Sequence, residues 1–296
     1  MVHRRYIHII HPSITFAENL ACYKAAASRL PWMSASSWAE WSIKRPEWQD
    51  PNNVIIFWLY GLPGLLDVIP QQRKAALAIW YMESVGPIDK LCPPQKATLA
   101  RFLDYFKTPD IVIATSPPAA AFLKPYCKKV TFAPTGYEPK VMGTPDWTRI
   151  KEYDFGYCGW PTGRRDWIIP ALENHFGNRM IHFFGPYGQE RKLIYEKCRA
   201  TLYIAHSDEP SFPGFRIWQS VATSSALVTE KRDVWPATAG RHYVEVPEAK
   251  KEDVGEFVAK IEQTLNLPLE EIARRAHTEL SLYAVDRAME YITAAI

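Results

Sequence analysis

Short apolar runs alternate with amphipathic segments along the first 140 residues. The apolar runs are rich in Ile, Val and aromatic side chains, which is typical of strands buried on both faces of a parallel sheet. The segments between them carry apolar side chains at helical spacing. Strand following helix in this way predicts an α/β domain with right-handed crossovers. The expected strands span residues 4–11, 53–60, 74–82, 110–116 and 129–139, the last ending in a turn, with helices near 13–30, 66–74, 95–107 and 117–127.

The same alternation starts again after a polar, irregular stretch at residues 141–152. We therefore predict two Rossmann-like, doubly wound domains that face each other across a cleft at the carboxyl ends of both sheets. The predicted division is an N-terminal domain at 1–140, a linker at 141–152, a C-terminal domain at 153–280, and a final helix at 281–296 that packs back on the N-terminal domain. The second domain has expected strands at 153–159, 179–185, 200–206, 226–231 and 242–247, and expected helices at 164–176, 188–198, 215–224, 233–240 and 251–266.

Composition narrows the class of protein. Hydrophobic residues make up 47% and charged residues 23% of the 296 positions, which is typical of a folded globular protein. The net charge of +3 is too small to indicate a nucleic-acid partner by itself. Five cysteines without a CxxC pair indicate free thiols in a reducing compartment. The amino terminus has no signal-peptide pattern, and no apolar run approaches a membrane span, so we expect a cytoplasmic protein with no membrane contact.

The stretch SFPGFRIWQS at residues 211–220 places an arginine directly behind a Pro-Gly turn, at the start of an amphipathic helix. A helix amino terminus already carries partial positive charge and unpaired N–H groups. Gly214 and Arg216 together therefore predict a pyrophosphate site. The alternative is that Arg216 forms an ion pair with Asp208 or Glu209.

Other glycines and arginines follow strand ends in the same half of the chain. Gly159 allows close approach of a substrate, and Arg164 and Arg165 open the next helix, where they could clamp a diphosphate. Gly185, followed by Tyr187, ends the next strand, where the base of a nucleotide would lie. The alternatives are solvated arginines and an ordinary strand-to-helix turn.

In this order the motifs resemble the nucleotide-sugar half of GT-B glycosyltransferases, especially small cytosolic enzymes of the spore-maturation and phage kinds. The resemblance covers about 140 residues and implies a UDP-sugar donor with no required metal. Gln219 stands where the family often has a glutamate that grips the ribose, and Ser211 stands where many retaining members have their first glutamate, which favours inversion. The implied donor-binding residues are Gly159, Arg164, Arg165, Gly185, Tyr187, His206, Ser211, Gly214, Arg216 and Gln219.

An inverting transfer needs a general base from the N-terminal half. Glu83 and His11 are the candidates because each follows an expected strand directly. The alternatives are that His11 caps the next helix and that Glu83 pairs with Lys90. The histidines show no metal-ligand spacing, and no DxD-type carboxylate pair stands in a suitable context, so we expect no metal site.

The loop at residues 32–48 interleaves tryptophans with basic residues, which suits stacking of bases or of sugar rings. Its expected acceptor-binding residues are Trp38, Trp41, Lys44 and Arg45, and a folded hydrophobic flap is the alternative.

Together these features predict transfer of a sugar, with glucose favoured, from a UDP-sugar to a hydroxyl. The favoured acceptor is a hydroxymethylated pyrimidine in phage-type DNA, and a phage-encoded enzyme would act in the host cytoplasm. A small molecule or an envelope glycan is the other acceptor class. A non-catalytic nucleotide- or sugar-binding module and a nucleotide-sugar epimerase are alternatives of a different class, and the oligomeric state stays open.

Overall fold

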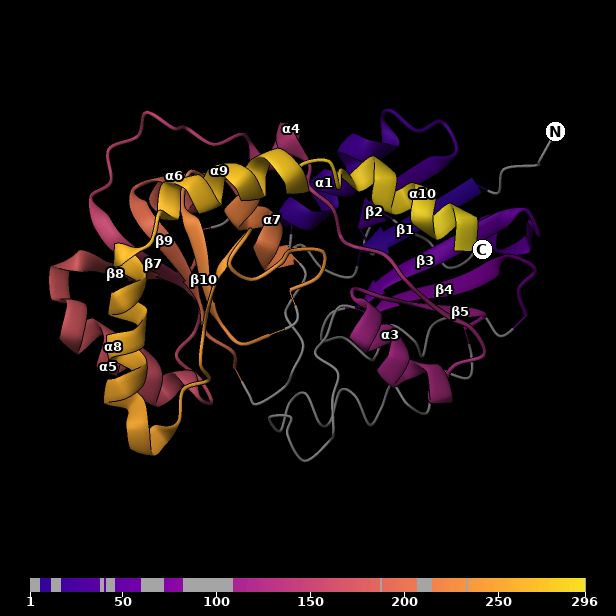
Figure 1. The fold of residues 1–296 in the computed structure, drawn as a ribbon. Coiled ribbons are helices and arrows are strands. Elements are labelled where there is room, and N and C mark those ends of the chain that lie inside the picture. Colours follow the sequence, from indigo (N-terminus) through magenta and orange to yellow (C-terminus); the bar gives the residue numbers. More distant parts are fainter. Residues whose placement is uncertain are drawn as a thin grey trace. The chain divides into compact units, whose positions relative to one another are not determined.

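The computed structural model describes residues 6–11, 17–37, 40, 46–59, 72–81, 109–186, 188–206, 215–232 and 234–295. Contacts within the chain divide it into two compact units (Figure 1). The first unit comprises Met1–Val141 together with Ala284–Ile296, and the second comprises Met142–Tyr283. The chain therefore crosses from one unit to the other twice.

The first unit contains a six-stranded sheet in which every strand pair is parallel. The strand order is β2-β1-β3-β4-β5-β6, so the direction of winding reverses between β1 and β3. A ligand of a doubly wound sheet binds outside the carboxyl ends of the strands at such a reversal. The strands are β1 (Tyr6–His11), β2 (Met33–Ser37), β3 (Asn53–Leu59), β4 (Ala76–Tyr81), β5 (Ile111–Ala114) and β6 (Val130–Phe132).

Helices from both ends of the chain pack on this sheet. Helix α1 contacts β2 and the C-terminal helix α10, which also contacts β6. Helix α3 begins with two prolines, and the Ser116 hydroxyl caps it by accepting the Ala119 N–H at 3.3 Å. The helices are α1 (Ala17–Ala27), α3 (Pro117–Leu123), α4 (Pro139–Met142) and α10 (Val285–Ala295), with short 3₁₀ helices at Pro46–Gln49 and Lys124–Tyr126.

An ion-pair network fixes α10 to the rest of the first unit. The Arg29 guanidinium donates to Asp286 at 2.6 and 2.9 Å, and to the buried Glu138 carboxylate at 2.5 Å. Gly136 has φ of +83°, and a Cβ there would lie 2.7 Å from the Val285 Cα. The amide of Val285 donates to the Tyr137 carbonyl at 3.2 Å, so backbone and side chains both hold the start of α10.

Strand β2 lies within residues 32–48, where the sequence predicted only a loop. The prediction was wrong because MSASS has no apolar alternation, although it pairs in parallel with β1 as an edge strand. Two tryptophans of the same stretch belong to the core. Trp32 is 9% exposed, and Trp48 is 1% exposed and stacks on Phe57 with ring centroids 6.1 Å apart. These two rings support folding and are not available for stacking on an acceptor.

The second unit contains a five-stranded parallel sheet in the order β11-β10-β9-β7-β8. Its winding reverses between β7 and β9. The strands are β7 (Tyr153–Cys158), β8 (Met180–Phe183), β9 (Cys198–Tyr203), β10 (Ala226–Glu230) and β11 (Val244–Val246). The helices are α5 (Arg165–Phe176), α6 (Gln189–Glu196), α7 (Phe215–Val221), α8 (Val254–Gln263) and α9 (Leu269–Leu280), with 3₁₀ helices at Gly177–Arg179, Lys251–Asp253 and Thr264–Asn266.

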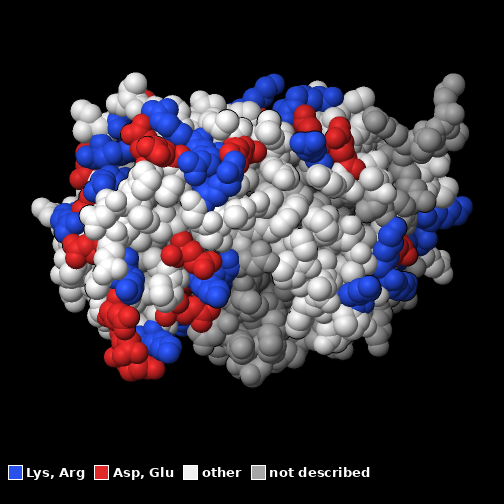
Figure 2. All heavy atoms as spheres, in the orientation of Figure 1, with Lys and Arg blue, Asp and Glu red and all other residues white. Residues whose placement is uncertain are grey.

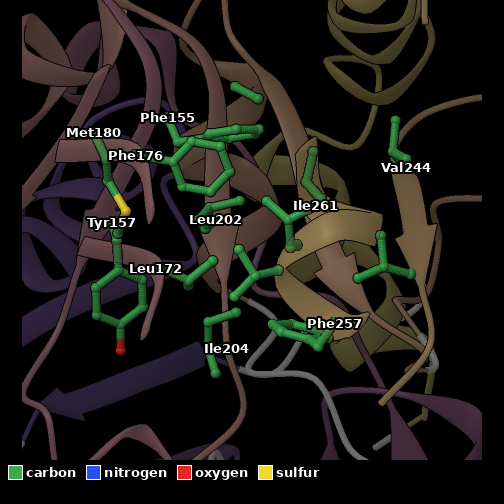
Figure 3. Close-up of a cluster of buried hydrophobic side chains, with 14 of the residues drawn as sticks. Phe155, Tyr157, Leu172, Phe176, Met180, Leu202, Ile204, Val244, Phe257 and Ile261 are labelled. Carbon is green, nitrogen blue, oxygen red and sulfur yellow. The ribbon is translucent and has the colours of Figure 1, made fainter. Parts of the chain in front are cut away.

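A continuous apolar core joins this sheet to its helices (Figure 3). Phe155 and Leu202 from the strands meet Leu172 and Phe176 from α5, and Phe257 from α8 closes the cluster. The Phe155 and Phe176 ring centroids are 4.9 Å apart. Apolar side chains at helical spacing in α5 and α8 are therefore what attaches these helices to the sheet.

The predicted helix at 233–240 is absent from the described residues 234–240, which form turns instead. Pro236 has no N–H to donate, and the Thr238 N–H bonds the Nδ1 of His242 at 2.9 Å rather than a helical carbonyl. For the remaining described residues the α/β prediction is confirmed, since both sheets are parallel and doubly wound. The predicted helix at 95–107, and residues 66–71 of the one at 66–74, lie outside the described residues. Within the described part of the chain, no helix has the length and apolarity required to cross a bilayer. The cysteines of that part are all free thiols, as predicted.

Candidate functional site

The winding reversal of the second unit brings together the loops that follow β7 and β9. Strand β7 runs into Cys158 and Gly159, and the chain leaves β9 through Ile204, Ala205 and His206. In a doubly wound sheet this edge is where ligands bind. Most of the donor-binding residues that the sequence predicted follow these two strands or belong to the helices that come after them.

Backbone contacts lock the two loops against each other. The Arg164 amide donates to the His206 carbonyl at 3.2 Å. Gly163 has φ of +65°, and a Cβ there would lie 2.6 Å from the same carbonyl oxygen. The Thr162 hydroxyl lies 2.8 Å from the His206 Nε2. Only glycine satisfies both the backbone angle and the close approach, so this position fixes the geometry of the edge.

Arg165 and His206 are half-buried neighbours at this edge. The Nε of Arg165 donates to the Ile204 carbonyl at 2.9 Å, and its guanidinium lies 6.0 Å from the centre of the Tyr157 ring. Burial lowers the pKa of His206, and the positive charge of Arg165 lowers it further. An anion bound here would lie near the positive charge of Arg165. Its negative charge would also raise the pKa of His206.

Arg164 is engaged in a buried ion pair. Its Nη1 and Nη2 donate to the two Glu230 oxygens at 3.2 and 2.7 Å, and Nη2 also donates to the Ala249 carbonyl at 2.7 Å. Glu230 is fully buried and accepts two more N–H groups, from Ala205 and Ala249, each at 2.9 Å. This carboxylate thus joins the carboxyl ends of β9 and β10 to the start of α5.

Glu230 was not among the predicted site residues. The sequence signal was an acidic side chain that ends an apolar strand, in ALVTEK. A buried carboxylate at such a place needs a cation beside it. Arg164 supplies that cation. The pairing itself required the three-dimensional structure, because 66 positions separate the two residues.

Arg216 lies on the first turn of α7 and has a different environment. Its Nη1 donates to the Gln219 side-chain oxygen at 3.4 Å. Burial lowers the pKa of this guanidinium, and neighbouring Tyr195, Cys158 and Tyr157 raise it above the ordinary arginine value. No carboxylate among the described residues forms an ion pair with it, and the side chain is only half-buried. A cation whose described neighbours are neutral groups is able to accept an anionic ligand.

Two aromatic rings that the sequence did not single out lie at the same edge. Trp160 follows Gly159, and Phe184 follows the end of β8. Their centroids are 4.4 Å apart with 29° between the planes, and the side chains are 61% and 49% exposed. Next to them, Gly185 has φ of +108°, and no atom lies within 4 Å of a Cβ built on it.

Several predicted site residues lie outside the described part of the chain. His11 ends β1 at the winding reversal of the first unit, but its side chain is not described. The undescribed positions are Tyr187, Ser211 and Gly214 of the donor set, Glu83 of the catalytic pair, and Trp38, Trp41, Lys44 and Arg45 of the acceptor set. Asp208 and Glu209, the alternative partners of Arg216, are also undescribed.

Charged side chains of both signs are interspersed on the described surface in Figure 2, most clearly over the second unit.

Among the described residues, no group of three or more His, Cys, Asp or Glu side chains could hold a metal ion.

No protein-family model matches the chain. Among curated proteins it is 25% identical over 129 residues to the uncharacterized protein L140 of Acanthamoeba polyphaga mimivirus, a match that spans 43% of this chain and 42% of that protein. The sequence comparison therefore covers less than half of either protein.

Solved structures match over almost the whole chain. Anabaena Alr3699/HepE in complex with UDP-glucose superposes with a TM-score of 0.66 and 10% identity, covering 98% of this chain and 100% of that one. BGT of phage T4 in complex with its UDP-glucose substrate superposes with a TM-score of 0.59 and 13% identity, covering 98% of each chain. The chain spans only 55% of TarM, at a TM-score of 0.56 and 9% identity. With two parallel, doubly wound units and this similarity along its length, the chain has the GT-B fold.

Proposed function

We propose that the protein is a glycosyltransferase that uses a UDP-sugar donor. The observation that carries the proposal is Arg216, a half-buried cation that pairs with no described carboxylate and lies at the carboxyl edge of a doubly wound sheet. The fold supports the same proposal, because structures with this fold have been solved with UDP-glucose bound. A diphosphate would supply a negative charge that no described carboxylate gives to Arg216.

The proposed reaction is an inverting, metal-independent transfer. The acceptor hydroxyl oxygen forms a bond to the anomeric carbon of the sugar, the bond from that carbon to the diphosphate oxygen breaks, and UDP leaves with the electron pair. A general base takes the hydroxyl proton, and His11 and Glu83 are the proposed candidates. Arg216 and Arg165 would stabilise the charge that develops on the leaving diphosphate.

The proposed donor set gives each of the residues named from the sequence a role. Arg165, His206 and Arg216 would contact the diphosphate, and Gln219 would bond the ribose hydroxyls through its amide. Arg164 would act through Glu230 as a positioning residue, since its guanidinium is already paired. The remaining members of the proposed set are Gly159, Gly185, Tyr187, Ser211 and Gly214.

The proposed acceptor is a hydroxymethylated pyrimidine in DNA, bound through Trp38, Trp41, Lys44 and Arg45. Support comes from the interleaved aromatic and basic residues of that stretch and from the fold shared with BGT of phage T4. A small molecule or an envelope glycan would use the same donor chemistry. Incubating the protein with UDP-glucose and either hydroxymethylated or unmodified DNA tests the acceptor. Release of UDP with both DNAs, or with neither, would count against this acceptor.

Replacing Arg216 tests the donor site. We expect Arg216→Ala to weaken UDP binding by about 1.5–3 kcal/mol, the usual effect of losing a hydrogen bond to a charged group. Isothermal titration calorimetry measures the change. Arg241→Ala is the matched control, because Arg241 is exposed and already paired with Glu279. Equal UDP affinity in a folded Arg216→Ala variant and in the control would contradict the proposal.

A further inference from the structure

The stacked rings of Trp160 and Phe184 are large apolar surfaces left in water. They are 61% and 49% exposed, whereas the other described tryptophans and phenylalanines are buried or half-buried. Burying apolar surface contributes roughly 25 cal/mol per Å², so leaving both rings exposed forgoes stability. Two exposed rings in contact, held at a ligand-binding edge, indicate a surface on which a third flat ring stacks.

The Trp160–Phe184 pair lies at the same edge of the sheet as the Arg216 guanidinium. β7 and β8 are adjacent parallel strands, so residues that directly follow them lie at the same edge of the sheet. Trp160 is two residues from Cys158, which is a neighbour of the Arg216 guanidinium. A nucleoside diphosphate combines a flat aromatic ring with a neighbouring anion, and this edge offers a complementary surface for both parts.

His182 holds the pair in place. Its Nδ1 lies 2.8 Å from the Glu173 carboxylate, and its Nε2 lies 2.8 Å from the Gly159 carbonyl. The Glu173 carboxylate and the Gly159 carbonyl are both hydrogen-bond acceptors. The Gly159 amide in turn donates to the Phe183 carbonyl at 3.2 Å. The loops after β7 and β8 are thus hydrogen-bonded to each other at Gly159 and Phe183. Each of these residues is next to one of the two exposed rings in the sequence.

We propose that Trp160 and Phe184 form the surface on which the nucleobase of the donor stacks, and that His182 is the positioning residue of this surface. The inference rests on the proposed function and assigns Trp160 and Phe184 to the base, for which the sequence indicated only Gly185 and Tyr187. Stacking uses the flat face of a ring and not its hydrogen-bonding edge. The pair therefore strengthens binding of a nucleotide without choosing among the bases.

Comparing UDP with inorganic pyrophosphate separates the base contact from the phosphate contact. We expect Trp160→Ala and Phe184→Ala to lower UDP affinity by about 5- to 150-fold, the usual effect of losing a stacked aromatic partner. Pyrophosphate has no base, so its affinity should stay unchanged, and CDP should weaken as UDP does. Trp160→Phe should restore most of the affinity. Tyr291→Ala, which removes an exposed ring from the first unit, is the control.

The outcomes distinguish this inference from the proposed function. If the native protein binds UDP and both alanine variants bind it within twofold of native, the stacking surface is wrong and the donor class stands. If those variants instead raise only the acceptor KM, the rings contact the acceptor, and the inference is again wrong. If the native protein binds no UDP, the proposed function fails, and this inference fails with it.

His182→Phe tests the positioning role. It keeps a ring against Tyr157 and Phe184 but removes both hydrogen bonds. We expect weaker UDP binding with unchanged pyrophosphate binding, because only the aromatic surface is displaced. If His182 only stabilised the second unit, its replacement would weaken the binding of UDP and of pyrophosphate together, or would weaken neither. Either of those two results would overturn the assignment of His182.

Discussion

At the scale of single residues, Gly163 sets the shape of the candidate site. Its positive φ costs any other residue roughly 1–2 kcal/mol, and its Cβ position is 2.6 Å from the His206 carbonyl. We expect Gly163→Ala to lower the free energy of unfolding by more than that strain alone, as measured by urea denaturation. Gly240→Ala is the control, since Gly240 has φ of +72° with open space around it. Equal losses in both variants would show that the close contact is unimportant.

A second residue-scale prediction concerns His206. Burial and the Arg165 charge lower its pKa below the ordinary 6.5. The folded state therefore binds this proton less readily than the unfolded state. The contribution to stability is present above about pH 6.5 and is lost as the pH falls through the folded pKa.

A bound diphosphate would bring negative charge near the imidazole and raise the His206 pKa. NMR titration of the imidazole, with and without saturating UDP, measures this change. We expect a rise in the native protein, and in Arg216→Ala a rise only at the higher UDP concentration that its weaker binding requires. A pKa of His206 that stays constant when UDP saturates the native protein would place the diphosphate elsewhere.

At the scale of secondary-structure elements, the Arg164–Glu230 pair joins α5 to the ends of β9 and β10. Removing one partner of a buried ion pair typically costs about 3–5 kcal/mol, because the other charge stays buried without compensation. We expect Glu230→Gln to lose stability in this range and Arg164→Met with Glu230→Gln to lose less than the sum of the two single changes. Urea denaturation of the three variants gives this double-mutant cycle. Additive losses would mean that the two side chains act independently.

Local sequence patterns predicted most elements because burial repeats with the period of each element. NVIIFWL is apolar after its first residue and ALAIWY is apolar along its length, and both form central parallel strands. MSASS was missed because an edge strand is held by backbone bonds to β1, which leave no trace in the side-chain pattern. Trp32 and Trp48 were assigned to an acceptor loop for a related reason, since the sequence alone does not show which tryptophans are buried.

At the scale of the whole molecule, the two units have separate cores, so a ligand of one unit should stabilise that unit in particular. At 100 times its Kd, UDP should raise the free energy of unfolding of the unit that binds it by about 2.7 kcal/mol. Hydrogen exchange should then slow in β7 and β9 more than in β3 and β4. Glucose alone is the control and should slow neither. Slower exchange only in the first unit would move the donor site out of the second one.

The sequence by itself determined that strands and helices alternate in two halves, and it selected Arg216, because apolar periodicity and turn residues are local properties. The tertiary structure decided what each cation does. Arg164 and Arg165 are neighbours in the chain, yet Arg164 enters a buried pair with Glu230 while Arg165 lies over Tyr157. It also revealed the Trp160–Phe184 surface and its support by His182. These contacts join loops that are distant in sequence, and parallel strand pairing is what brings them together.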